Sequence, residues 1–186
     1  MEYKYKKISL HNLIKKINSS DKSNMYSKFI EKYILNYLSK FKINSFEQFI
    51  NSNTSHLDFF KKYDSDAKIY FSYLTDKQNK KIIAIEKTIM MNEKFFDIKY
   101  FNDIVEQKDN VLYGINLFVD EDYRGKSLCK HLLSRIKLNA KKNNVKYIVS
   151  DIHDENIPSI KCHLSQDFKK LNVLSYKNTY FYIAIL

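Results

Sequence analysis

Residues 111–133 read VLYGINLFVDEDYRGKSLCKHLL and contain the strongest structural signal in this sequence. Residues 111–119 are mostly apolar, β-branched or aromatic, which is typical of a buried strand. From Ser127 onward, apolar residues recur at helical spacing, at Leu128, Leu132, Leu133 and Ile136. A strand that enters a helix through a tight basic turn, here YRGK at 123–126, directs free backbone N–H groups and the positive end of the helix dipole toward one point. The stretch therefore predicts an anion site, and phosphate is the usual anion there.

The turn resembles the central motif of the GNAT superfamily of acyltransferases, whose pattern is Arg/Gln-x-x-Gly-x-Gly/Ala. Arg124, Ser127 and Cys129 occupy its three defined positions. Ser127 replaces a Gly, and Cys129 replaces a Gly or Ala. Both residues are still small, so the backbone can approach a pyrophosphate, but the conformational freedom of glycine is lost. An ordinary strand–turn–helix with a basic turn gives a similar pattern.

A second segment adds to the resemblance. Residues 147–168, YIVSDIHDENIPSIKCHLSQDF, resemble the next element of the same family, which is a strand, an Asn and a short helix that ends in Gly-Phe. His163 stands where the family usually has Tyr, and Asp167 stands where it usually has Gly. The residues at matching spacings are Asn156, Ser159, Ile160 and Phe168. The two motifs cover roughly residues 111–168, and the N-terminal half matches only in its order of elements.

The order of predicted elements also agrees with this family. Predicted strands cover residues 3–10, 68–74, 82–91, 111–119, 145–152, 171–176 and 180–186. Predicted helical segments cover residues 13–17, 25–41, 45–50, 57–63, 127–136 and 158–164, with a polar break at 51–56. The resemblance implies an α/β (α+β) fold with a mixed, mostly antiparallel central sheet flanked by helices. It also implies that the sheet splays between the central strand and the next one, and that the thioester binds in the split.

Length and composition predict one domain over residues 1–186. No stretch approaches the roughly 18 apolar residues of a membrane span, and the N-terminus lacks the apolar core of a signal peptide. We therefore expect a cytoplasmic protein with no membrane partner. Cys129 and Cys162 are the two cysteines, and in that compartment we expect free thiols and no zinc site.

The formal net charge of +11 has two interpretations. It indicates either a polyanionic partner or a compositional bias toward lysine. Of the 32 basic residues all are Lys except Arg124 and Arg135, whereas proteins that read nucleic acid usually employ Arg. This favours the bias, so nucleic acid is an unlikely partner. The expected partners are acetyl-CoA and an amine acceptor, and a homodimer is left open.

The resemblance implies a set of donor-binding residues and no metal. Backbone N–H groups from 124 to 129 would face the pyrophosphate, and N–H groups near 118 and 119 would polarise the thioester carbonyl. The predicted donor site comprises Phe118, Val119, Arg124, Gly125, Lys126, Ser127, Leu128, Cys129, Asn156 and Ser159.

Proton transfer has one candidate acid and several candidate bases. The family supplies the proton for the departing thiolate from the Tyr that His163 replaces, and a His can do the same. Some members use as base a Glu that aligns with Tyr113, which is a poor base at a reference pKa of about 10. Asp151, His153 or a chain of waters are alternatives. Each histidine could also be an ordinary structural or surface residue.

The sequence thus predicts an N-acetyltransferase that moves an acetyl group from acetyl-CoA to a primary amine of a small molecule, an amino sugar, or a peptide or protein. One alternative keeps the fold but takes the acyl group from an acyl-carrier protein. Another is a catalytically degenerate binding module for RNA or a protein partner. Residues 92–110 are irregular and aromatic, which fits either a packed loop or part of the acceptor pocket.

Overall fold

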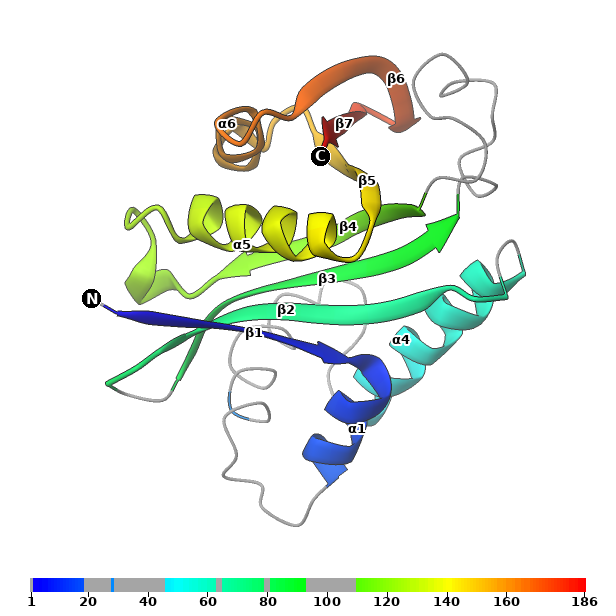
Figure 1. Ribbon diagram of the computed structural model, residues 1–186, viewed down its shortest axis with the longest axis vertical. Coiled ribbons are helices and arrows are strands. Elements are labelled where there is room, and N and C mark those ends of the chain that lie inside the picture. The colour runs from blue at the N-terminus through cyan, green and yellow to red at the C-terminus, as the bar shows by residue number, and fades with distance from the viewer. Residues whose placement is uncertain (1, 19–27, 29–45, 63–64, 79–80, 93–109) are drawn as a thin grey trace.

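The computed structural model describes residues 2–18, 28, 46–62, 65–78, 81–92 and 110–186 (Figure 1). In this part of the chain, one sheet has the strand order β1-β2-β3-β4-β5-β7-β6. The strands are β1 (Tyr3–Ser9), β2 (Lys68–Asp76), β3 (Ile82–Asn92), β4 (Asn110–Val119), β5 (Val145–His153), β6 (Lys169–Tyr176) and β7 (Thr179–Ile185). The helices are α1 (Leu10–Asn18), α4 (Phe46–Lys61), the 3-10 turn η5 (Glu121–Tyr123), α5 (Leu128–Lys142) and α6 (Ile157–Leu164).

The sheet opens between β4 and β5, which are its one parallel pair among the described strands. Their pairing runs from Asn110↔Val145 only as far as Gly114↔Ser150. Beyond that point β4 stays paired with β3 to Val119, while β5 stays paired with β7. All other neighbouring strands are antiparallel. The predicted mixed, mostly antiparallel sheet that splays between the central strand and the next one is therefore confirmed.

Two apolar clusters cover the two faces of the sheet. On one face, α5 places the predicted stripe of Leu128, Leu132 and Ile136 against buried residues of the sheet. The other face carries a second cluster with residues of α1 and α4, among them Leu13 and Phe49. Figure 1 shows α5 alongside β4, with α1 and α4 on the opposite side of the sheet. We call these surfaces the α5 face and the α4 face.

Helix α4 corrects one detail of the prediction. The expected polar break at 51–56 does not occur, and the helix is continuous over Phe46–Lys61. Asn53 Nδ2 donates to the carbonyl of Phe49 at 2.8 Å, and Thr54 Oγ1 donates to the carbonyl of Ile50 at 3.0 Å. Because these polar side chains bond back to the helix, they do not interrupt it.

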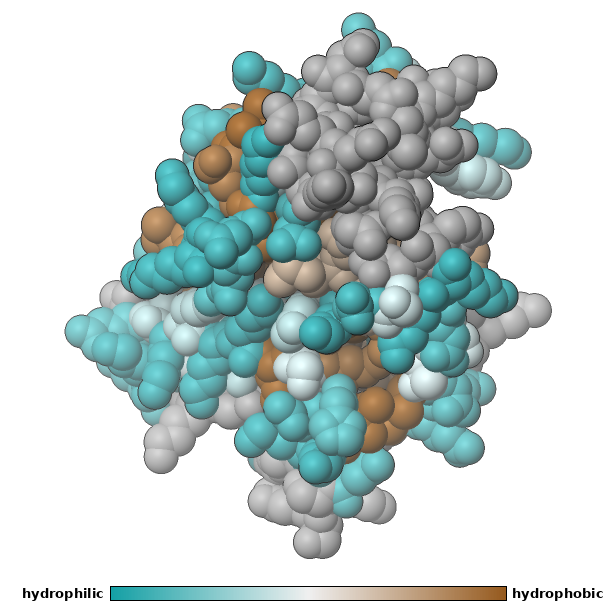
Figure 2. All heavy atoms as spheres, turned by 45° about the vertical axis from the view of Figure 1, so that its right-hand side comes forward, coloured by the Kyte–Doolittle hydropathy of each residue, from teal (hydrophilic) through white to brown (hydrophobic). Residues whose placement is uncertain are grey.

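Two other predictions lie outside the described residues. These are the helix at 25–41, apart from residue 28, and the interpretation of 92–110 as an acceptor pocket. The described surface of the view in Figure 2 is mostly hydrophilic, with hydrophobic side chains showing in smaller patches. Within the described ranges, no helix combines the length and apolar character needed to cross a bilayer.

Candidate active site

The turn that follows β4 is anchored by buried polar contacts at η5. Asp120 is fully buried; its carboxylate accepts a hydrogen bond from the backbone N–H of Asp122 at 3.1 Å and forms an ion pair with Lys81. The hydroxyl of Tyr123 donates to the carboxylate of Asp76 at 3.0 Å. These contacts fix the position at which the chain leaves the sheet and enters α5.

The turn itself contains two residues in the left-handed backbone region. Gly125 has φ +76° and Ser127 has φ +55°. Ser127 precedes α5 without a side-chain capping bond. Within the described part of the chain, the backbone N–H groups of residues 125–130 have no hydrogen-bond acceptor. They lie at the positive end of a 15-residue helix, which is an arrangement suited to an anion.

The basic side chains of the turn point toward η5. Arg124 has a guanidinium nitrogen 3.7 Å from a carboxylate oxygen of Glu121, and both side chains are exposed. The Nζ atom of Lys126 donates to the carbonyl of Asp122 at 3.2 Å and lies 4.8 Å from the ring centroid of Tyr123. The free groups of the turn are therefore backbone amides more than side chains.

The second half of β4 presents an unpaired edge toward β5. The N–H of Asp120 donates to the carbonyl of Ile83 on β3 at 2.9 Å. Because N–H groups alternate between the two edges of a strand, the N–H of Phe118 also faces β3, whereas that of Val119 faces the split. Of the two residues predicted to polarise the thioester carbonyl, Val119 has the suitable direction.

On the α4 face, a hydrogen-bonded cluster joins β4, β5 and β6. The hydroxyl of Tyr113 donates to Asp151 Oδ1 at 2.7 Å, and Ser175 Oγ donates to Asp151 Oδ2 at 3.3 Å. Burial, and then the neighbouring Asp151 carboxylate, raise the pKa of Tyr113. Tyr113 is therefore a proton donor at neutral pH, and Asp151 is the group in this cluster that can accept a proton. Asp151 directly follows Ser150, the last residue of β5 paired with β4.

Lys87 and His56 form a second polar pair on the α4 face. The Nζ atom of Lys87 lies 3.3 Å from Nδ1 of His56. Burial lowers the pKa of Lys87 to about 8, and burial together with Lys87 lowers the pKa of His56 to about 4. The ring of His56 packs at a tilt against the ring of Phe60. The ring centroids of Phe60 and Tyr113 are 6.4 Å apart. The sequence suggested no partner for His56.

On the α5 face, Gly114 is covered by buried polar side chains. A Cβ atom at Gly114 would lie 2.5 Å from Glu86 Oε1 and 2.8 Å from Ser150 Oγ, so a larger residue there would force these side chains to shift. Glu86, Thr88 and Ser150 each have a fully buried side-chain oxygen that finds no hydrogen-bond partner among the residues that the structure describes. Burial raises the pKa of Glu86 to about 8, so this carboxyl is mostly uncharged at neutral pH. Sequence reasoning missed Glu86, because nothing in the alternation of β3 distinguishes it from a surface residue.

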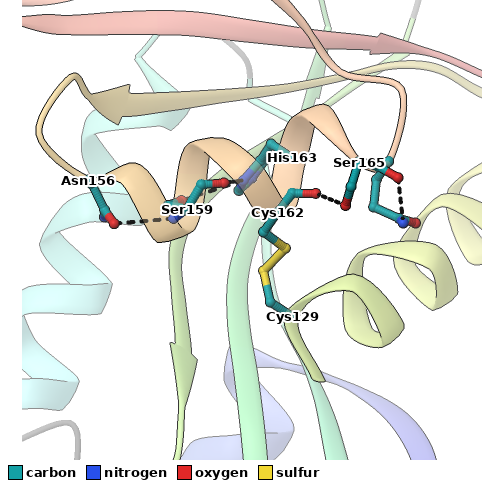
Figure 3. The surroundings of a disulfide bond; sticks show 7 residues. Cys129, Asn156, Ser159, Cys162, His163 and Ser165 are labelled. Atoms are coloured by element: carbon teal, nitrogen blue, oxygen red, sulfur yellow. Dashed lines mark hydrogen bonds between the residues drawn. A yellow bond between two sulfur atoms is a disulfide. The ribbon is translucent and has the colours of Figure 1, made fainter. Parts of the chain in front are cut away.

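Helix α6 aligns three of the predicted site residues (Figure 3). Asn156 caps the helix by accepting from the N–H of Ser159 at 3.3 Å. The carbonyl of Ser159 lies 2.9 Å from Nδ1 of His163. Because a carbonyl only accepts, Nδ1 carries the hydrogen, and Nε2 of the neutral ring has the lone pair. His163 is buried against Phe168, and this burial lowers its pKa.

The cysteines contradict the expectation of free thiols. Cys129 in the first turn of α5 and Cys162 in α6 form a disulfide, with their Cα atoms 6.3 Å apart (Figure 3). Two helices that pack on the same face bring together residues separated by 33 positions in the sequence. That proximity follows from the packing of α6 against α5, which the spacing of the cysteines does not indicate.

The remaining candidates are placed as follows. His153, at the end of β5, is exposed, and its Nδ1 lies 3.3 Å from Asp154 Oδ1. Among the described residues, the polar contacts of its ring are with Asp154 and Glu155, so the structure brings Tyr113 and Asp151 together and leaves His153 apart. Leu128 is the first residue of α5, and its side chain is buried in the apolar cluster of the α5 face. No group of three or more metal-ligating side chains occurs among the described residues.

An acyltransferase-like arrangement is defined by the sheet that opens beside β4, the amide-rich turn into α5 and the short helix α6. A model of the acetyltransferase (GNAT) family matches residues 41–168, which include β2 to β5, the turn into α5, and α6. The chain belongs to this family and is an acetyltransferase. None of the curated proteins compared with the sequence matches it.

Solved structures share the fold at low sequence identity. NAA60 of Arabidopsis thaliana, in complex with a bisubstrate analogue, is 13% identical with a TM-score of 0.61, covering 99% of this chain and 98% of its own. The same protein in complex with acetyl-CoA is 13% identical with a TM-score of 0.58, covering 100% and 99%. The PaiA N-acetyltransferase of Thermoplasma acidophilum, in complex with coenzyme A, is 15% identical with a TM-score of 0.58 and full coverage of both chains.

Proposed function

We propose that this enzyme transfers an acetyl group from acetyl-CoA to a primary amine, with the donor bound along the split between β4 and β5. The observation that carries the proposal is the conjunction of two features at one end of β4. The pairing of β4 with β5 stops at Gly114, and the strand then leads into a turn whose amides at 125–130 have no acceptor within the described residues. The family and the acetyl-CoA complex of NAA60 support this choice of donor.

The donor would bind through backbone groups. The amides of the turn would hold the pyrophosphate at the positive end of α5. The N–H of Val119 would stabilise the oxyanion that forms when the amine attacks the thioester carbonyl. Both roles depend on backbone geometry, which explains why the turn can replace two of the family's small residues with Ser127 and Cys129.

Proton transfer would use opposite faces of the sheet. Asp151, oriented by Tyr113, would take the proton that the attacking amine loses. His163, protonated at Nε2, would give a proton to the thiolate of CoA as the C–S bond breaks. The acceptor is a primary amine on a small molecule, an amino sugar, or a peptide or protein.

Thermal unfolding in the presence of ligands tests the proposal. Acetyl-CoA at about 100 times its Kd should raise the Tm by about 5–10 °C, because a ligand that binds only the native state stabilises it. A coupled assay of CoA release with a panel of amines then identifies the acceptor. No shift at millimolar acetyl-CoA, with longer acyl-CoAs also inert, would reject the proposal.

The same screen separates the alternatives. A shift with acyl-carrier protein but not with acyl-CoA would change the donor, and a shift with RNA alone would indicate a binding module. Cytoplasmic location and a homodimer remain proposals, to be tested by cell fractionation and by light scattering.

A further inference from the structure

We propose that Cys129 and Cys162 form a thiol–disulfide exchange site whose redox state sets the affinity of the enzyme for its acyl donor. The inference rests on the proposed donor site, because Cys129 lies within the turn assigned to the pyrophosphate. The disulfide joins this turn to α6, the helix that carries His163 beside Cys162 (Figure 3). One covalent bond therefore connects the part that would hold the phosphates with the part that would protonate the leaving group.

The bond adds a restraint to the part of the turn that follows the anchored residues of η5. Ser127 makes no capping bond, and the amides of residues 125–130 have no acceptor within the described part of the chain. Helix α6 is better fixed, since it is capped by Asn156 and its Cys162 is only 5% exposed. The disulfide thus ties a weakly restrained segment to a firmly packed one, and this preorganises the amides of the turn for an anion.

Reduction would change both the restraint and the charge of the turn. A dithiol reductant attacks one sulfur as its thiolate, and the Cys129–Cys162 bond breaks as a mixed disulfide forms. Its second thiol then displaces the protein sulfur, so the reductant leaves as a cyclic disulfide and the protein keeps two thiols. Cys129 is half-buried, which gives the reductant access from the side of α5.

The reduced state should bind the donor less tightly for two reasons. The turn loses its covalent connection to α6. The positive end of α5 also stabilises the thiolate form of Cys129, and that negative charge would compete with the pyrophosphate for the same amides. The other contacts between α5 and α6 survive reduction, including Lys137 Nζ to the carbonyl of Gln166 at 2.7 Å, so the fold itself is retained.

Linkage makes the effect reciprocal. If the oxidised form binds the donor more tightly by some factor, the bound donor must make the disulfide harder to reduce by the same factor. A tenfold difference in affinity corresponds to a shift of about 30 mV in the reduction potential of this two-electron couple.

Acetyl-CoA titrations of the oxidised and the reduced protein test the proposal. Acetyl-CoA suits this purpose because it carries no free thiol. Reduced protein is prepared with dithiothreitol and desalted without oxygen, and a thiol reagent counts the free cysteines in each sample. We expect Kd to rise about tenfold on reduction, within the usual range of coupling free energies. The Cys129→Ser/Cys162→Ser double variant should bind weakly in both conditions, and the Cys162→Ser variant, which keeps the thiol at 129, should bind more weakly still.

Hydrogen exchange of residues 125–131 gives a second readout that needs no donor. Exchange should be faster in the reduced protein than in the oxidised one, while β2 and β3 keep their protection. Equal exchange and equal Kd in both redox states would overturn the inference and leave the proposed function intact. Failure of both forms to bind acetyl-CoA would instead overturn the proposed function. In that case faster exchange would still show that the disulfide restrains the turn, and equal exchange would reject both ideas.

Discussion

The two faces of the sheet differ where β4 and β5 separate. On the α4 face, Asp151 is held by hydrogen bonds from Tyr113 and Ser175, and it is only partly buried. On the α5 face, Glu86 is fully buried, and one of its carboxyl oxygens has no hydrogen-bond partner within the described part of the chain. Burial raises the pKa of Glu86 to about 8. The two carboxyl groups near the end of the strand pairing therefore lie in different environments, and that of Glu86 is mostly uncharged at neutral pH.

This difference indicates which carboxyl group can do chemistry. A general base must be able to accept a proton and be reachable by its substrate. Glu86 is buried and already mostly protonated, whereas Asp151 is partly exposed. The α5 face instead carries the groups assigned to the donor and its leaving thiolate, namely the turn at 124–129 and His163. The amine would thus lose its proton on the α4 face, and the departing sulfur would gain its proton on the α5 face.

The largest effect is expected from His163→Ala, which should lower kcat by about 10²–10⁴-fold with little change in the KM for acetyl-CoA. His163→Tyr should restore much of the loss. The wild-type rate should fall as pH rises through the pKa of His163, which burial holds below its usual range, because only the protonated ring donates. The Tyr variant should lack this dependence. The exposed His11→Ala serves as the control, and an unchanged kcat in His163→Ala would remove this residue from the mechanism.

A somewhat smaller loss is expected from Asp151→Asn, which keeps the shape and the hydrogen bond from Tyr113 but removes the charge. Its kcat should fall by about 10²-fold if the carboxylate is the base. Tyr113→Phe should lower kcat by a smaller factor, and the effects of the two substitutions should be non-additive in the double variant. Asp154→Asn removes the same charge from an exposed neighbour and should leave kcat nearly unchanged. If Asp151→Asn and Asp154→Asn behave alike in steady-state kinetics, the two faces do not divide the chemistry as described.

Glu86→Gln should alter the pH dependence of stability. The pKa of this carboxyl is about 8 in the folded protein and near the ordinary value of 4.5 when unfolded, so between these values the folded state binds more protons. Stability of the wild type should therefore fall as pH rises through this window, and the Gln variant should lack that fall. Denaturant unfolding at pH 5 and pH 8 should show the variant gaining about 2 kcal/mol or more relative to wild type. If the free energies of unfolding of the variant and the wild type differ by the same amount at both pH values, Glu86 is ionised in the native state.

The smallest effect is expected from Ser127→Gly, which should stabilise the protein by up to about 1 kcal/mol, because its φ of +55° suits glycine. Asp167→Gly should behave similarly at φ +62°. Ser134→Gly, inside α5, is the matched control and should destabilise by about 0.5–1 kcal/mol. Thermal unfolding measures all three, and a loss of stability in Ser127→Gly would show that its side chain has an unrecognised role.

These two residues show why the sequence predicted the fold so well. Ser127 and Asp167 depart from the family pattern in chemistry, yet both adopt the left-handed backbone that glycine would have. The periodic signals of β4 and α5 depend on burial of apolar residues, so they survive such replacements. The point at which the sheet splits does not follow from this pattern, because Gly114 lies in the middle of β4 and Ser150 lies inside β5.

The parts that could not be predicted depend on contacts between distant segments. The disulfide requires α6 to pack on α5, and Lys87 meets His56 only because α4 crosses the opposite face. The polar residues of 51–56 suggested a break, but Asn53 and Thr54 donate to carbonyls one turn back and the helix continues. The choice of Asp151 over His153 as the candidate base has a related reason. Only the structure shows that Asp151 accepts a hydrogen bond from Tyr113 and that His153 is exposed.

The most direct test of the proposed donor site is a calorimetric titration of acetyl-CoA into the wild type, Ser127→Asp and Ser127→Asn. Asp and Asn have the same shape and both tolerate a left-handed backbone, so the pair differs only in charge. We expect the Asn variant to bind nearly as well as wild type and the Asp variant to bind about tenfold more weakly, because its carboxylate would lie beside the pyrophosphate. Equal affinity of the two variants for acetyl-CoA would place the phosphates away from this turn and contradict the account.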